Sequence, residues 1–158
     1  MNDALSKAKV EKALRECETH LKRMNYARGK LAALMPMDES GYLALTEAQI
    51  ESLDQYIFRY IKMQDAMGER LFRQMLDLLE EPARSLPFLD KLNRLEQLGA
   101  ISSKEAWLKL RNLRNLLTHE YEDDSASMSE VINQVYVVYP EVEATYQQAA
   151  NFIRPYLH

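Results

Sequence analysis

Hydrophobic residues recur along the first 35 positions at alternating steps of four and three residues. The apolar positions in this stripe are Val10, Leu14, Cys17, Leu21, Met24, Leu31 and Met35, and Arg28 takes one slot between them. A spacing of about 3.5 residues predicts a long helix that packs antiparallel on another helix. Pro36 and Gly41 are expected to end this helix.

A second apolar stripe follows Thr46 and predicts another long helix. Thr46 and Gln49 have the spacing of a capping box, in which each side chain bonds a free backbone N–H at the helix start. The stripe consists of Ile50, Leu53, Ile57, Tyr60, Met67, Leu71 and Leu78. Gln64 and Gln74 lie on the same face, and we expect Gln64 to join a hydrogen-bonded core network if it is buried. The two glutamates before Pro82 are expected to end the helix.

Two shorter helices are predicted next. Pro87 can open the first of them, and Gly99 supplies its end, since glycine readily adopts the left-handed conformation of a helix C-terminus. Ser102 and Glu105 form a further capping-box pattern. This pattern predicts the start of a helix that carries Trp107 and several leucines.

The last predicted helix begins at Ser127, which forms another capping-box pattern with Glu130, and extends to about Leu157. A kink is expected at Pro140, which cannot donate a backbone hydrogen bond. Residues 135–139, VYVVY, favour a strand by composition. They lie inside this helical pattern, so no strand is expected.

Together these patterns predict an all-α protein, an up-and-down bundle of about five helices. The whole chain, residues 1–158, is expected to form a single domain. Within it, residues 1–45 would supply the long N-terminal helix and a loop, and residues 46–158 would supply the rest of the bundle.

Composition narrows the possible functions. The chain has 158 residues, 47% of them hydrophobic, and a net charge of −4, so nucleic-acid binding would need a local basic patch. Its single cysteine, Cys17, excludes a disulfide framework and fits a reducing cytosol. No apolar run approaches the roughly 20 residues needed to cross a bilayer, and the N-terminal segment is too charged for a signal peptide. We therefore expect a soluble, cytoplasmic protein that does not contact membranes.

Polar chemistry concentrates in the segment RNLRNLLTHEYEDD, residues 111–124, where the helical pattern gives way to an acidic run. Within eight positions it holds Arg114, Asn115, His119 and Tyr121. Cations near the end of a helix also favour its negative pole, so a purely structural explanation is available.

The spacing R-x4-H discriminates poorly by itself. Arg15 and His20 repeat it within the first predicted helix, but no amide follows Arg15, and Lys22 stands where the tyrosine would be. His20 lies in a charged segment and is expected to be exposed to solvent. Cys17 lies on the apolar face and is expected to be a core residue.

Arg114 and His119 suit the chemistry of RNA transesterification. An RNA strand carries its own nucleophile, the 2′-OH, and needs a base, an acid for the leaving 5′-oxygen and a cation for the charge that develops on phosphorus. Histidine transfers protons near neutrality, and arginine clamps phosphate in bidentate fashion. Lys104, Lys109 and Arg111 on the same predicted helix are candidate RNA contacts.

This chemistry requires no metal ion. The chain contains no glycine-rich phosphate loop, no zinc-type spacing of cysteine and histidine, and no G-x-S-x-G motif. We therefore expect neither a metal nor a cofactor.

One motif helix supplies too few groups for the reaction. It carries one arginine and one histidine of the motif, and residues five apart on a helix point roughly 140° away from each other. Two copies that face each other across a two-fold axis would supply two of each. The sequence therefore predicts a homodimer with the site in a shared cleft.

The pattern R-x4-H-x-Y, with a polar residue directly after the arginine, resembles the signature of HEPN-domain proteins. It is most similar to that of the HepT toxin branch, which includes nucleotidyltransferase-associated substrate-binding proteins. The signature positions are matched by Arg114, Asn115, His119 and Tyr121. Residues 46–157 also resemble the helical layout of the family, whereas residues 1–45 resemble it only as a long helix and loop.

The resemblance implies a helical bundle that dimerises through its motif helices, and a metal-independent ribonuclease that uses Arg114 and His119, with Asn115 as a further catalytic candidate. It implies a toxin whose antitoxin is a minimal nucleotidyltransferase of the MNT type, which neutralises it by transferring AMP to Tyr121. Some members of the family are instead non-catalytic substrate-binding subunits of the transferase. That alternative stays open, as does a bundle with a purely structural role.

Two further points stay open at this stage. The acidic run 120–124 lies where an RNA phosphate would approach, and it could instead place cationic groups or Mg²⁺ for a transferase partner. The sequence also does not decide whether Arg59, Gln64 or Asp65, on the second long helix, reaches the motif.

Overall fold

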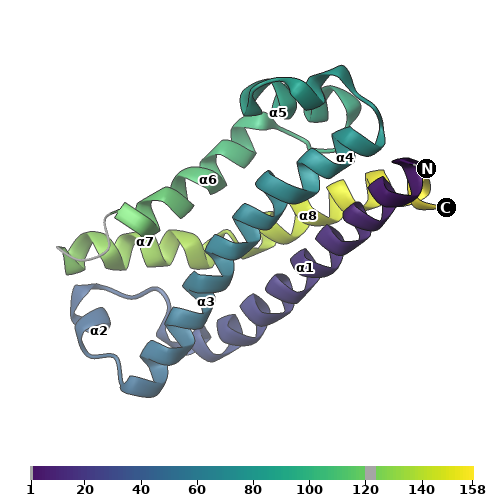
Figure 1. Ribbon diagram of the computed structural model, residues 1–158. Helices are drawn as coiled ribbons and strands as arrows, with labels where there is room; N and C mark the ends of the chain where they lie inside the picture. The colour runs from purple at the N-terminus through teal and green to yellow at the C-terminus, as the bar shows by residue number, and fades with distance from the viewer. Residues whose placement is uncertain (1, 120–123) are drawn as a thin grey trace.

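The computed structural model describes residues 2–119 and 124–158, which form helices and short connections without any strand. Helix α1 (Asn2–Leu31) and the long helical segment that begins with α3 (Glu47–Asp65) lie side by side in the bundle (Figure 1). The all-α prediction is confirmed. None of the described helices is both long and apolar enough to span a membrane.

Helix α1 buries the stripe that the sequence predicted, apart from Met35, which lies beyond it and is only partly buried. The connection that follows holds a 3-10 turn, η1 (Ala32–Leu34), and a short helix, α2 (Glu39–Leu43). The prediction that Gly41 breaks the helical pattern is wrong. Gly41 lies inside α2, where its N–H donates to the side chain of the capping residue Asp38 at 2.7 Å.

The second long helix runs without a break through α3, a π-helical turn labelled η2 (Ala66–Leu71), and α4 (Phe72–Leu78). The predicted capping box is confirmed: Thr46 N donates to Gln49 Oε1 at 2.8 Å, and Gln49 N donates to Thr46 Oγ1 at 3.2 Å. The helix ends just before Glu80, as predicted.

Helices α5 (Phe88–Leu98) and α6 (Lys104–His119) follow a 3-10 turn, η3 (Pro82–Ser85). Gly99 ends α5 with a φ of 82°, as predicted. The cap of α6 lies one residue later than predicted. Ser103 Oγ accepts from Ala106 N at 3.1 Å, whereas the Ser102 hydroxyl bonds Gln148 of the last long helix.

The predicted last helix is two helices, α7 (Ser125–Val137) and α8 (Tyr139–Ile153), followed by a 3-10 turn, η4 (Arg154–Leu157). The helix is interrupted at Val138. Pro140 is accommodated in the first turn of α8, where the backbone N–H that proline lacks would have no helical partner. Residues 135–139 form no strand, as expected.

The cap of α7 is not the predicted Ser127. The Asp124 carboxylate accepts from Ala126 N at 3.1 Å, and from the N–H and the hydroxyl of Ser127 at 3.4 and 2.8 Å. The bonds from Ser127 are the main reason that the pKa of Asp124 is lowered. The estimate of about five helices is also too low. With α3, η2 and α4 counted as one, the described residues form seven helices.

Buried tyrosines fasten the helices to one another. Tyr60 donates to the carbonyl oxygen of Leu110 at 2.7 Å and ties α3 to α6, and Tyr56 donates to that of Val135 at 2.8 Å. Burial raises the pKa of both phenols. A buried hydroxyl that has found an acceptor specifies which carbonyl lies opposite, so these bonds fix the register of the bundle.

Gln64 does not form the hydrogen bonds that were predicted for it with other described residues. Its side chain is fully buried on α3, but neither amide atom has a hydrogen-bond partner among the described residues. The predicted core network therefore does not form within the described part of the chain. Cys17, by contrast, is a core residue as expected, and burial raises the pKa of its thiol to about 12.

Candidate functional site

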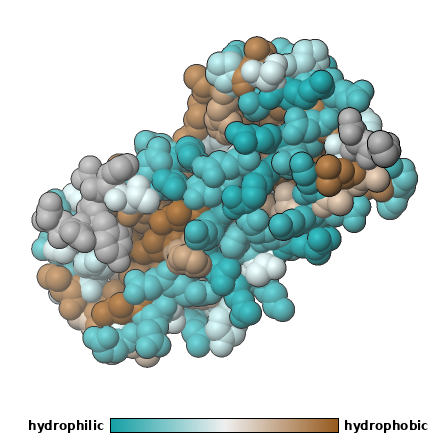
Figure 2. All heavy atoms as spheres, viewed as in Figure 1, coloured by the Kyte–Doolittle hydropathy of each residue, from teal (hydrophilic) through white to brown (hydrophobic). Residues whose placement is uncertain are grey.

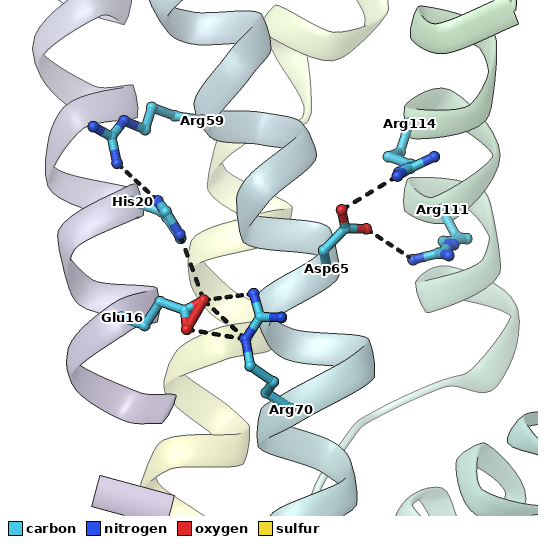
Figure 3. A network of polar contacts seen from close by, with 7 residues as sticks. All are labelled: Glu16, His20, Arg59, Asp65, Arg70, Arg111 and Arg114. Carbon is cyan, nitrogen blue, oxygen red and sulfur yellow. Dashed lines mark hydrogen bonds and ion pairs between the residues drawn. The ribbon is translucent and has the colours of Figure 1, made fainter. Parts of the chain in front are cut away.

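One carboxylate and two guanidinium groups connect α3 to α6. Arg111 Nη1 lies 3.4 Å from Asp65 Oδ1, and Arg114 Nη2 lies 3.2 Å from Asp65 Oδ2 (Figure 3). The three side chains are 29%, 22% and 18% exposed for Arg111, Arg114 and Asp65. We call this group the Asp65–arginine cluster. The two arginines are three residues apart, so they project from adjacent turns of one face of α6.

The π-helical turn and Gly68 bring α3 and α6 together at this point. A Cβ atom at Gly68 would lie 3.1 Å from the Trp107 ring and 3.9 Å from Arg111 Nη1, so any side chain here would crowd Trp107 of α6. π-helical turns insert an extra residue into a helix and occur often at functional sites. This turn begins directly after Asp65, so the same irregularity that admits Trp107 also places the carboxylate.

The cluster carries a net positive charge. One carboxylate faces two guanidinium groups, and arginine stays protonated at any ordinary pH. Each guanidinium has five N–H donors, of which the cluster uses one in Arg111 and one in Arg114. The Nε atom of Arg114 is buried and has no partner among the described residues. The cluster therefore keeps donors and charge with which it could bind a phosphate group.

The two predicted lysine contacts lie outside the cluster. Lys109 Nζ lies 3.4 Å from Glu141 of α8, on another side of α6 from Asp65. Lys104 begins α6, and its backbone N–H donates to Glu96 Oε2 at 2.8 Å. Of the three candidate RNA contacts, the structure brings only Arg111 beside Arg114.

The rest of the motif lies at the C-terminal end of α6. Asn115 is exposed, and its carbonyl accepts from Thr118 Oγ1 at 2.9 Å. His119 is the last residue of α6, but its side chain lies outside the description. Tyr121 and most of the acidic run also lie outside the described residues, so the predicted roles of His119 and Tyr121 stay predictions.

Asp65 is the site residue that sequence reasoning did not identify. It was one of three open possibilities on the second long helix, and nothing in its local pattern sets it apart from other carboxylates. Its partners lie 46 and 49 residues away. Only the packing of α3 on α6 reveals the contact.

A second polar cluster lies on the opposite side of α3, against α1 (Figure 3). His20 is 8% exposed, so its expected exposure to solvent is wrong. Its Nδ1 lies 3.0 Å from Arg59 Nη1, and because a guanidinium only donates, Nδ1 accepts this hydrogen bond. Glu16 Oε2 lies 3.7 Å from the other ring nitrogen, and Arg70 bonds both Glu16 oxygens at 2.6 to 3.0 Å.

Burial and the charge of Arg59 lower the pKa of His20, against the influence of Glu16. The hydrogen bond to Glu16 raises the pKa of Arg70. The charged sequence neighbours of His20 suggested an exposed position, but the His20 side chain faces α3.

No three side chains of His, Cys, Asp or Glu lie close enough to hold a metal ion in the part of the chain that the structure describes. Comparison of the chain with models of known protein families, with curated proteins and with solved structures gave no match. The likeness to the HEPN family therefore rests on the sequence motif, and the functions it implies are proposals.

Proposed function

We propose that this protein is a metal-independent endoribonuclease, the toxin of a HEPN–MNT toxin–antitoxin pair. The observation that carries the proposal is the Asp65–arginine cluster. It presents two arginines of the motif helix side by side, with free donors, near the helix end that bears His119. Paired guanidinium groups on a rigid helix are well suited to a phosphodiester.

The proposed reaction is an intramolecular transesterification of RNA. A base, His119, removes the proton of a 2′-OH, and the 2′-oxygen forms a bond to the adjacent phosphorus. The bond from phosphorus to the 5′-oxygen breaks, and an acid returns a proton to that oxygen. The products are a 2′,3′-cyclic phosphate and a 5′-OH end, and no other reactant is needed.

Each residue of the cluster has a distinct task in this scheme. Arg114 stabilises the charge that develops on the phosphorane, and Arg111 binds a neighbouring phosphate. Asp65 holds both guanidinium groups in place, so it is a positioning residue. The acid would be His119 of a second copy, which is why the scheme needs a homodimer. A protein that sediments as a monomer at micromolar concentration would contradict this part of the proposal.

The family resemblance implies the neutralisation step, which would act on Tyr121, two residues after His119 in the sequence. Its hydroxyl would attack the α-phosphorus of ATP in the transferase and release pyrophosphate. The resulting AMP carries a full negative charge, which would compete with RNA phosphate for Arg114. Co-expression with the transferase should therefore silence the wild type but not Tyr121→Phe, and should add one AMP to the intact mass of the wild type alone.

A second candidate is a non-catalytic subunit that binds substrate for the transferase. It is favoured by Asp65, which already engages both arginines, and by the acidic run that follows His119. Purified protein incubated with total RNA and EDTA separates the two candidates. Cleavage that persists with the chelator and is lost in Arg114→Ala supports the ribonuclease. Intact RNA together with tight binding to the transferase supports the subunit.

A further inference from the structure

Phe58 is a large apolar side chain that remains 49% exposed on α3. Two cations lie over its ring: Arg59 Cζ is 5.4 Å and Lys62 Nζ is 5.5 Å from the ring centroid. Both distances are within the roughly 6 Å at which a cation is attracted to the face of an aromatic ring. An exposed ring with two cations packed against it combines an aromatic surface with positive charge, the two features that bind unpaired nucleotides.

Phe58 lies in line with the Asp65–arginine cluster. Phe58, Lys62 and Asp65 are spaced four and three residues apart, so they project from one side of α3. Seven residues of helix separate the ring from the carboxylate by about 10.5 Å along the axis, at about 1.5 Å per residue. At about 3.4 Å per stacked nucleotide, this distance spans about three nucleotides.

Arg59, one of the two cations, is held in place by a residue of α1. The guanidinium of Arg59 bonds His20 of α1 at 3.0 Å, as Figure 3 shows, and also lies against Phe58. The guanidinium of Arg59 is therefore fixed by its contact with α1. A fixed cation loses less conformational freedom when a phosphate binds than a freely moving side chain would.

The surroundings of Phe58 agree with a polar ligand. Figure 2 shows a face that is mostly hydrophilic, with apolar areas over α5, toward the α2 and α6–α7 end of the bundle, and near the N-terminus. The local charge at Phe58 is positive, because Arg59 and Lys62 flank it, although the whole chain is acidic. Base stacking on an aromatic ring, with cations on the backbone, is the usual mode of binding single strands.

We propose that Phe58 is a stacking platform for an unpaired base, and that it guides single-stranded RNA toward the Asp65–arginine cluster. Lys62 and Arg59 contact the phosphates on either side of the stacked base. The choice of RNA over DNA rests on the proposed ribonuclease function. The stacking itself rests on the contacts of Phe58 alone.

The test uses a fluorescein-labelled single-stranded oligonucleotide with 2′-O-methyl groups throughout, which has no 2′-OH nucleophile and cannot be cut. Its affinity for the full chain is measured by fluorescence anisotropy at fixed salt. Phe58→Ala should weaken binding by about 5- to 150-fold, the loss expected for one stacked base. Phe58→Trp should keep the affinity. Tyr156→Ala is the matched control, since Tyr156 is also an aromatic side chain that is 49% exposed, and it should bind as the wild type does.

A spectroscopic signature separates stacking from general surface effects. The chain has one tryptophan, Trp107, which is 1% exposed and should not respond to the oligonucleotide. In Phe58→Trp the new indole should be quenched on binding, while the wild-type emission stays constant. Unquenched emission, or an unchanged affinity of Phe58→Ala, would overturn the platform.

The experiment also distinguishes this inference from the proposed function. If the wild type cleaves RNA but Phe58→Ala binds the oligonucleotide normally, the stacking proposal is wrong and the ribonuclease proposal stands. If Phe58 stacks on the oligonucleotide but the wild type does not cleave RNA, the ribonuclease proposal is wrong and the protein only binds RNA. If Phe58→Ala binds RNA normally but turns a sedimenting dimer into a monomer, the ring contacts a second copy of the chain, and the proposal is wrong.

Discussion

Arg114 of α6 and Asp65 of α3 are 49 residues apart in the sequence, yet Arg114 Nη2 lies 3.2 Å from Asp65 Oδ2. Asp65 also binds Arg111, so one carboxylate orders both arginines of the motif helix. Without it, two partly buried guanidinium groups would repel each other across adjacent turns. The arrangement makes Asp65 the residue on which the geometry of the candidate site depends.

Replacing Asp65 by Asn should therefore reduce both stability and activity. We expect the free energy of unfolding to fall by roughly 1–2 kcal/mol, since partly buried charged hydrogen bonds are lost. RNA cleavage should fall by about 10- to 100-fold, as happens when catalytic groups are misplaced by an ångström. Urea unfolding and a cleavage assay measure the two effects.

Glu141→Gln is the control: it breaks an ion pair with Lys109 in which both side chains are more than half exposed, and it should change stability by less than about 0.5 kcal/mol. If Asp65→Asn cleaves RNA at the wild-type rate, the carboxylate does not position Arg114.

The close approach of Gly68 to the Trp107 ring leads to a second prediction. Gly68→Ala should lower the free energy of unfolding by about 1–3 kcal/mol, because the added methyl group presses on the buried Trp107 ring 3.1 Å away. The comparison is Gly29→Ala in α1, where nothing lies within 4 Å of the new atom. That change should stabilise the protein by about 0.5–1 kcal/mol through the higher helix propensity of alanine. Urea unfolding of both variants gives the result, and equal effects would mean that the π-helical turn does not depend on this contact.

These two glycines illustrate what the sequence could and could not reveal. Apolar spacing is a local property, so the stripes of α1 and α3, the Thr46–Gln49 capping box and the stop at Gly99 were predictable. The π-helical turn was not, because no local spacing marks it and the Trp107 ring beside it comes from another helix. The caps of α6 and α7 were missed because Ser103 and Asp124 offer the same chemistry as the predicted Ser102 and Ser127 in adjacent or nearby positions.

The candidate site shows the same division. Arg111 and Arg114 were correctly assigned to one helix, and their spacing of three residues fixes the face they share. Asp65 could not be assigned, because its contact depends on how α3 and α6 cross. His20 was misjudged, because the identity of its sequence neighbours says little about which face of α1 is covered by α3.

Buried Gln64 yields a third prediction. Its amide atoms have no partner among the described residues, so none of these residues compensates the amide for the water it has lost. Gln64→Met, which keeps the length of the side chain and removes the amide, should raise the free energy of unfolding by about 1–2 kcal/mol. Chemical unfolding measures the change. A loss of stability would mean that the amide is satisfied, for instance by a bound water molecule or by a second copy of the chain.

The buried His20 predicts a dependence of stability on pH. Its pKa is lowered in the folded protein, so between the two pKa values the unfolded chain binds more protons than the native state. This contribution to stability is fully present above the unfolded value of about 6.5 and is lost as the pH falls through the lower, folded value. His20→Gln retains an acceptor for Arg59 but does not titrate. The loss of unfolding free energy between pH 7 and pH 5 should be smaller in this variant than in the wild type. Identical slopes would show that His20 is protonated in the folded state as readily as in the unfolded one.

The most direct test of the ribonuclease proposal is the chemistry of the RNA ends produced in the presence of EDTA. Wild-type protein is incubated with a defined RNA that contains a mapped cleavage site, and with the same RNA bearing one 2′-deoxy nucleotide immediately 5′ to that site. We predict 2′,3′-cyclic phosphate and 5′-OH ends by mass spectrometry, no cleavage at the deoxy position, and no cleavage by His119→Ala or Arg114→Ala. Arg15→Ala, a change at an exposed position in α1, should cleave as the wild type does. Cleavage that continues at the deoxy position, or that survives His119→Ala, would contradict the account.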